Sequence, residues 1–153
     1  MDLLIRLIAD GLVVLVFVLG AGTFLLTVKE NAYQRYVRAY VAGLTAFLVA
    51  KVLSLLYESA ERPFIALGVE PKASFLDNPG FPSDHALFVM TITFIIYAAT
   101  RRSAVGLILL GLSVLVCIGR VIALVHAPID VIGGVIAAYI GVALWYGWRL
   151  QRP

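Results

Sequence analysis

The sequence predicts an all-α membrane protein, a polytopic bundle of about five spanning helices with a short helix in one extracytoplasmic loop. Hydrophobic residues make up 62% of its 153 residues and charged residues only 14%, too little polar surface for a water-soluble domain of this size. Several windows hold the roughly 20 apolar residues that a helix needs to cross a bilayer. Without an internal repeat or a low-complexity tract, residues 1–153 are expected to form a single membrane-embedded domain.

The first two spans are expected at residues 4–28 and 39–57. The first is nearly continuous leucine, valine, isoleucine and phenylalanine. We interpret it as a membrane helix and not as a cleavable signal, because Asp2 and Asp10 flank its only arginine and no small-residue cleavage site follows. The second is apolar apart from Lys51 and a few hydroxyl groups.

Residues 58–83 differ in composition from the rest of the chain. Acidic residues alternate there with prolines and a glycine, a pattern that cannot lie in lipid because its backbone polar groups need water or protein partners. We expect an aqueous loop with one short interfacial helix. Three further spans should follow, at residues 84–100, 104–121 and 129–146.

Basic residues near the ends of the spans predict the orientation in the membrane. If five spans alternate, one side of the bilayer receives Lys29, Arg35, Arg38, Arg101, Arg102, Arg149 and Arg152. Lysine and arginine accumulate on the cytoplasmic side of membrane proteins. The acidic loop and the N-terminus should therefore face outward. Cys117 is the only cysteine, so no disulfide can form within the chain.

Three groups of polar residues lie at the outward ends of the predicted spans. They are Lys51 with Glu61-Arg62-Pro63, then Pro82-Ser83-Asp84-His85, and finally Gly119-Arg120 with His126 and Asp130. Both histidines of the chain belong to these groups. Because ionisable residues at membrane depth are costly, they are functional candidates by default. We therefore predict one shared site at the outer face.

The spacing of His126 and Asp130 suits covalent catalysis. Residues four apart in a helical turn share one face, so the carboxylate can accept one ring N–H and fix the tautomer. The other ring nitrogen is then available as a nucleophile or base. His85, when protonated, can give its proton to a departing oxygen.

The remaining candidates suit the binding of phosphate. Arg62 and Arg120 carry planar forks that match phosphate oxygens and stay charged in most surroundings. Ser83 can donate its hydroxyl beside the free backbone N–H groups at the start of a helix. We find no ligand spacing typical of a metal site.

Each candidate also has a structural interpretation. Arg62 and Arg120 fit anchors for lipid head groups, and Asp130 fits a capping residue of the last span. Lys51 fits a side chain that reaches from the span to the interface. The case for a shared site depends on all of them meeting at one end of the bundle.

The three groups resemble the tripartite signature of the type 2 phosphatidic acid phosphatase superfamily. That signature is lysine, six residues and Arg-Pro; then Pro-Ser-Gly-His; then Ser-Arg, five residues, histidine, three residues and aspartate. The resemblance covers residues 51–130. It implies a phosphohistidine at His126, oriented by Asp130, with His85 as the acid for the leaving group. It also implies that no metal or other cofactor takes part.

The chain departs from this signature at three positions. Leu55 occupies the lysine position, and the nearest lysine, Lys51, lies one helical turn earlier and about 16 Å from Arg62 along an unbroken helix. Asp84 replaces the glycine, and Gly119 replaces the serine and its hydroxyl. The sequence Pro-Ser-Asp-His resembles the variant found in bacterial undecaprenyl diphosphate phosphatases.

The expected function is hydrolysis of a lipid phosphate at the outer face of the cytoplasmic membrane, with undecaprenyl diphosphate as the favoured substrate. Two alternatives stay open: a phosphatidylglycerophosphate or phosphatidic acid phosphatase, and a non-catalytic protein that binds lipid phosphate. The expected partners are the lipid substrate and the bilayer, and no nucleic acid. Bacterial members typically have six spans, so an N-terminal helix is missing here, or residues 63–82 contain an additional short piece.

Overall fold

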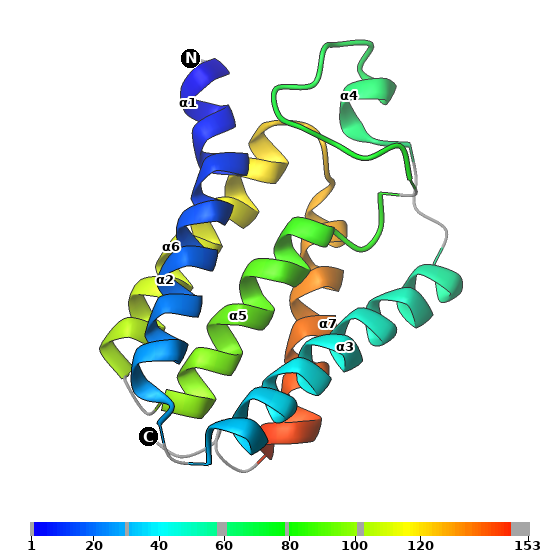
Figure 1. The fold of residues 1–153 in the computed structure, drawn as a ribbon. Helices are drawn as coiled ribbons and strands as arrows, with labels where there is room; N and C mark the ends of the chain where they lie inside the picture. The colour runs from blue at the N-terminus through cyan, green and yellow to red at the C-terminus, as the bar shows by residue number, and fades with distance from the viewer. Residues whose placement is uncertain (1, 30, 58–60, 79, 101–102, 148–153) are drawn as a thin grey trace.

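The computed structural model describes residues 2–29, 31–57, 61–78, 80–100 and 103–147, and within them every regular element is a helix. The all-α prediction is therefore confirmed (Figure 1). The elements are α1 (Asp2–Arg6), the π-helix η1 (Leu7–Gly11), α2 (Leu12–Thr27), α3 (Ala32–Leu56), α4 (Pro63–Ala66), α5 (Asp84–Thr100), α6 (Ser103–Ile122) and α7 (Pro128–Tyr146).

Within the described ranges, four helical segments are long and apolar enough to cross a membrane: Asp2–Thr27, Ala32–Leu56, Ala104–Ile122 and Pro128–Tyr146. The fifth predicted span corresponds to α5, which is apolar but shorter, at 17 residues. The five expected helices are thus present in the expected order. The second of them begins at Ala32 and not near residue 39, because the polar and aromatic residues before it continue the helix.

The first long helix is not uniformly α-helical. Its segment η1 is a π-helix, in which the N–H of Leu12 donates to the carbonyl oxygen of Leu7, five residues earlier. Such a turn inserts one extra residue into the helix and changes which side chains face the neighbouring helices. Here it lies beside α6 and includes Asp10.

α5 is the central helix of the bundle. It contacts α2, α3, α6 and α7, and ten of its 17 residues are buried. A hydrogen bond of 2.9 Å between the hydroxyls of Thr93 and Ser113 links it to α6. Small residues allow close approach on its other side, where a Cβ on Gly134 would lie only 2.7 Å from the carbonyl oxygen of Ser83.

The outer faces of the bundle are apolar and exposed. Examples are Phe17 on α2, Leu48 on α3, Ile108 on α6 and Leu144 on α7. A surface of this kind is stable against lipid tails and not against water. The chain is therefore described as a multi-pass membrane protein.

The two ends of the bundle differ in composition. One end holds the start of α1, the short helix α4 and the turn between α6 and α7 (Figure 1). Lys29, Arg35 and Arg38 belong to the opposite end, between α2 and the first turns of α3. The other basic residues used to predict orientation, Arg101, Arg102, Arg149 and Arg152, lie outside the described residues.

Candidate functional site

The start of α7 brings His126 and Asp130 together. Pro128 occupies the first turn, where its missing N–H costs nothing. The Oδ2 atom of Asp130 accepts a 2.8 Å hydrogen bond from the N–H of Ala127 and lies 3.6 Å from Nδ1 of His126. Asp130 therefore caps the helix and also faces the imidazole, so both interpretations made from the sequence describe it. The distance to Nδ1 is an ion-pair contact and not a hydrogen bond.

His126 itself is only 5% exposed. Its Nδ1 atom has no hydrogen-bond partner among the described residues. A buried ring nitrogen without a hydrogen-bond partner lowers the stability of a fold, so such an atom needs another explanation, for example a functional role. Because Asp130 faces Nδ1, the other nitrogen, Nε2, is the one left for a ligand or reactant.

Arg62 precedes α4 and is 7% exposed. Its Nη1 donates to the carbonyl oxygen of Val125 at 2.7 Å, next to His126 in sequence. Its Nη2 donates to the carbonyl oxygens of Leu76 and Asn78 at 2.9 and 3.2 Å, and to Oδ1 of Asn78 at 2.8 Å. The guanidinium group is thus held against the turn that carries His126.

Nearby acidic residues oppose the effect that burial has on the pKa of Arg62. Burial lowers the pKa of this guanidinium, whereas the nearby charges of Asp130, Asp84 and Asp77 raise it. An arginine has so high a pKa that it stays charged under this balance. Arg62 therefore brings a fixed positive charge close to the carboxylate of Asp130.

Arg120 lies in the last turn of α6 and is 1% exposed. Its Nη1 donates to Oδ1 of Asp10 at 2.6 Å, and its Nη2 donates to the carbonyl oxygen of Ser74 at 2.7 Å. Its Nε has no hydrogen-bond partner in the part of the chain that the structure describes. One edge of the guanidinium group is thus fixed, and a donor on the other edge is available.

The start of α5 supplies Ser83 and His85. Ser83 is fully buried, and its N–H donates to the carbonyl oxygen of Asp130 at 2.9 Å. Its hydroxyl oxygen accepts from the N–H of Ala86 at 3.5 Å, which leaves the hydroxyl hydrogen available to an acceptor. The Nε2 atom of His85 lies 3.8 Å from Oδ1 of Asp10.

Electrostatic interactions place the predicted residues in one neighbourhood. His85 interacts with the charges of Arg120 and His126, and Arg120 interacts with that of Arg62. A Cβ at Gly80 would lie 3.5 Å from Oδ2 of Asp130. Six of the seven residues predicted from the sequence therefore meet at one end of the bundle: Arg62, Ser83, His85, Arg120, His126 and Asp130.

Lys51 is the predicted residue that stays apart. Its side chain is exposed on α3, and its ammonium nitrogen lies 5.1 Å from the centre of the Phe47 ring. It lines a small pocket of about 50 Å³ together with Asn78 and Asp84. Leu55, at the lysine position of the signature, is 87% exposed. α3 runs obliquely to the other long helices (Figure 1), and among the described residues no hydrogen bond or ion pair joins Lys51 to Arg62 or Arg120.

Asp10 was not among the site residues predicted from the sequence. Its carboxylate joins Arg120, His85 and the N–H of Ser74, the last at 2.9 Å. A charged residue inside an apolar helix is energetically costly, so an acidic residue there indicates a functional or structural role. Asp10 carried this signal. The sequence could not show the π-helical turn, and the aspartate was used only as an argument against a signal peptide.

A short segment, residues 72–78, covers the two arginines. We call it the covering segment. It supplies the carbonyl oxygens of Ser74, Leu76 and Asn78 that accept from the guanidinium groups, and Lys72 pairs with Asp2 at 3.3 Å.

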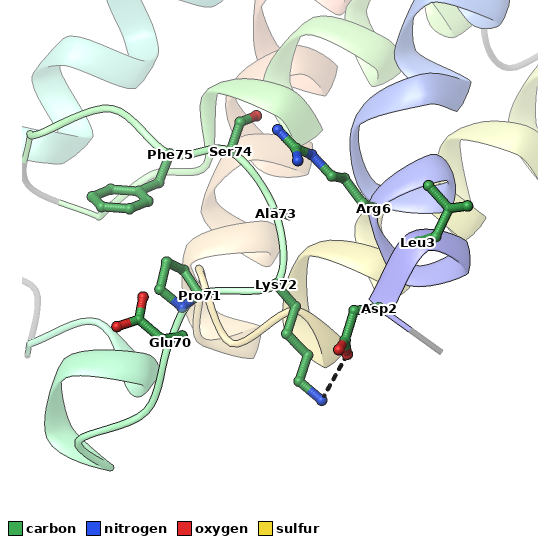
Figure 2. A pocket seen from close by; sticks show the side chains of 9 residues that line it. All are labelled: Asp2, Leu3, Arg6, Glu70, Pro71, Lys72, Ala73, Ser74 and Phe75. Atoms are coloured by element: carbon green, nitrogen blue, oxygen red, sulfur yellow. Dashed lines mark ion pairs between the residues drawn. The ribbon is translucent and has the colours of Figure 1, made fainter.

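A cavity of about 700 Å³ lies beyond the covering segment, between residues 70–75 and the start of α1. Figure 2 shows Arg6 extending from α1 toward Ser74 in this cavity. Within the described residues, no group of three histidine, cysteine or acidic side chains forms a candidate metal site.

These features define a helical membrane protein with buried guanidinium and imidazole groups at one end. The chain belongs to the PAP2 superfamily, because the model of that family matches residues 12–153. It is 28% identical over 136 residues to the bacitracin transport permease protein BcrC of Bacillus licheniformis, an alignment that covers 88% of this chain and 64% of that protein.

It is also 28% identical over 116 residues to the undecaprenyl-diphosphatase BcrC of Bacillus subtilis (strain 168), which covers 75% of this chain and 58% of that protein. The chain therefore spans less than two thirds of the length of either relative. No solved structure matches it.

Proposed function

We propose that the protein removes phosphate from a membrane lipid phosphate or diphosphate, with undecaprenyl diphosphate as its substrate. The main supporting observation is the meeting of two buried guanidinium groups, two imidazole rings and a carboxylate at one end of an apolar bundle. Guanidinium forks hold phosphate oxygens, and imidazoles supply the nucleophile and the acid. Family membership supports the same class of reaction.

In the first step, Nε2 of His126 attacks the terminal phosphorus. A nitrogen–phosphorus bond forms while the bond from phosphorus to the leaving oxygen breaks, and His85 gives its proton to that oxygen. Asp130 faces Nδ1 and stabilises the positive charge that develops on the ring. The leaving group from a diphosphate is the lipid monophosphate.

In the second step, water attacks the phosphorus and the nitrogen–phosphorus bond breaks. His85 takes a proton from the water, and inorganic phosphate leaves. The unpaired Nε of Arg120 and the hydroxyl of Ser83 are the donors for the phosphoryl oxygens in both steps. No metal or other cofactor takes part in this scheme.

The choice of substrate rests on two sequence comparisons. One relative carries the name undecaprenyl-diphosphatase, and the sequence Pro-Ser-Asp-His of residues 82–85 resembles the variant in that group. The product would be undecaprenyl phosphate. The basic residues at the opposite end of the bundle support a site on the extracytoplasmic side.

The test is release of inorganic phosphate by the purified protein in lipid nanodiscs. Undecaprenyl diphosphate, phosphatidylglycerophosphate and phosphatidate are compared, and we expect the largest kcat/KM for the first. His126→Ala should lower kcat at least about a thousandfold, because the change removes the proposed nucleophile. Lys29→Ala, at the far end of the bundle, is the matched control and should leave the rate unchanged.

Binding of all three lipids without phosphate release would show a non-catalytic protein and refute the proposal. Faster release from another lipid would refute the choice of substrate alone. Loss of activity on addition of EDTA, with recovery on addition of a divalent metal, would refute the metal-free scheme.

A further inference from the structure

We propose that Asp10 is a positioning residue of the site, which holds the Arg120 guanidinium group and attracts the protonated His85 ring. This inference rests on the proposed lipid phosphatase function. Asp10 lies before residue 12, where the match to the family model begins, and outside the three groups of the signature. Its role is therefore argued from the contacts of this chain alone.

Asp10 connects three separate parts of the site. Its Oδ1 lies 2.6 Å from Nη1 of Arg120 and 3.8 Å from Nε2 of His85, and its Oδ2 accepts from the N–H of Ser74 at 2.9 Å. It thereby joins α6, α5 and the covering segment. A residue that served only to neutralise Arg120 would not need the other two contacts.

The π-helical turn and Gly119 together bring Asp10 to this position. A Cβ at Gly119 would lie 2.9 Å from Cγ2 of Ile8 and 3.1 Å from both Cα and N of Ala9. Two of these atoms belong to the backbone, which cannot move aside without displacing the turn. The first helix can approach α6 so closely only because residue 119 has no side chain.

Gly119 is also the position where the family signature has a serine. The chain therefore has no hydroxyl group at position 119 of α6, and a carboxylate from the first helix contacts the neighbouring Arg120. A side chain at position 119 would press on the backbone of Ala9 and shift the turn that carries Asp10.

The carboxylate has a definite effect on both partners. Arg120 is bound on Nη1 and Nη2 by Asp10 and Ser74, so its unpaired Nε keeps a fixed direction. The negative charge also offsets the repulsion between Arg120 and Arg62. It attracts the imidazolium form of His85, which the proposed first step requires.

The test compares Asp10→Asn with the wild type in steady-state phosphate release from undecaprenyl diphosphate. Because both partners act in the transition state, we expect kcat to fall about ten- to a hundredfold while KM changes less than about threefold. Each rate is divided by the concentration of folded protein, which is measured by size-exclusion chromatography. An unchanged kcat per folded molecule would show a purely structural role and overturn the inference.

Gly119→Ala is the second variant and also serves if Asp10→Asn does not fold. Gly119→Ala alone should lower kcat, because it displaces the Asp10 carboxylate. Added to Asp10→Asn, it should not lower kcat further, because the side chain that it displaces has already lost its charge. Gly111→Ala, on the same helix with open space around its Cβ, is the matched control and should behave as the wild type. Independent, multiplicative effects of the two variants would overturn the proposed link.

Two further outcomes are distinguishable. A lower KM with an unchanged kcat in Asp10→Asn would mean that the carboxylate competes with phosphate, which overturns the inference alone. A wild-type protein that releases no phosphate from any lipid would overturn the proposed function, and this inference with it.

Discussion

The histidine side and the arginine side of the candidate site are held in different ways. Asp130 and Ser83 stand at the starts of α7 and α5. The N–H of Ala127 donates to Oδ2 of Asp130 at 2.8 Å within the start of α7, and the N–H of Ser83 donates to the carbonyl oxygen of Asp130 at 2.9 Å and joins the two helix starts. Arg62 and Arg120 instead donate to carbonyl oxygens of the covering segment. His126 is thus oriented by residues of two packed helix starts, whereas part of the hydrogen bonding of both arginines comes from a loop.

This difference indicates which side adapts when a phosphate binds. Carbonyl oxygens are neutral acceptors, and a phosphate oxygen forms stronger, charge-assisted bonds with a guanidinium group. We therefore expect the substrate to replace part of the covering segment around the arginines. The position of His126 beside Asp130 should stay the same.

The strongest test of the helix-borne side is Asp130→Asn. The amide keeps the size of the carboxylate but loses its charge, so Nδ1 of His126 no longer faces an anion and the ring can adopt the wrong tautomer. We expect kcat to fall at least about a hundredfold, measured by phosphate release from undecaprenyl diphosphate. Glu70→Gln, which also replaces a carboxylate by its amide but at an exposed position outside the covering segment, is the matched control. Equal activities of the two variants would contradict the role of Asp130.

A smaller effect is expected on the loop-borne side, from Asn78→Ala. This change removes the 2.8 Å hydrogen bond from Arg62 to Oδ1 of Asn78, which a phosphate would otherwise have to displace. One such bond is worth about 1 kcal/mol, so KM should fall about two- to fivefold with little change in kcat. A rise in KM would show that the covering segment holds Arg62 in the binding position.

The smallest effect is expected for Lys51→Ala. The side chain is exposed and packs over Phe47, and among the described residues it makes no hydrogen bond or ion pair with either arginine. Removing it should change kcat/KM by less than about twofold, because water and salt screen the charge of an exposed cation. A loss of tenfold or more in the same assay would return Lys51 to the site, through the pocket that it shares with Asp84.

The sequence predicted most of the fold because long apolar runs leave few alternatives in a membrane. All five helices and a short helix in the loop of residues 58–83 were expected, and they are present, the short helix as α4. The start of α3 was placed seven residues late, since hydropathy falls before Ala39 although Tyr33, Gln34 and Arg35 continue the helix on its exposed side.

The candidate site was predicted in part. Two signals that agree, charge at membrane depth and the family signature, predicted Arg62, Arg120 and the two histidines. Asp10 was missed because its importance depends on a π-helical turn, and no local pattern of residues announces that geometry. The structural reason for a glycine at position 119 is the close backbone of the first helix, which the sequence does not show.

The shortness of the central helix has a consequence for the depth of the site. With 17 residues, α5 is roughly 25 Å long, less than the hydrocarbon thickness of about 30 Å. Because α2, α3, α6 and α7 enclose α5, its length determines how deep His85 lies inside the bundle and not the thickness of the lipid around it. We therefore expect a lipid substrate to bring its head group into the end of the bundle to reach the first turn of this helix.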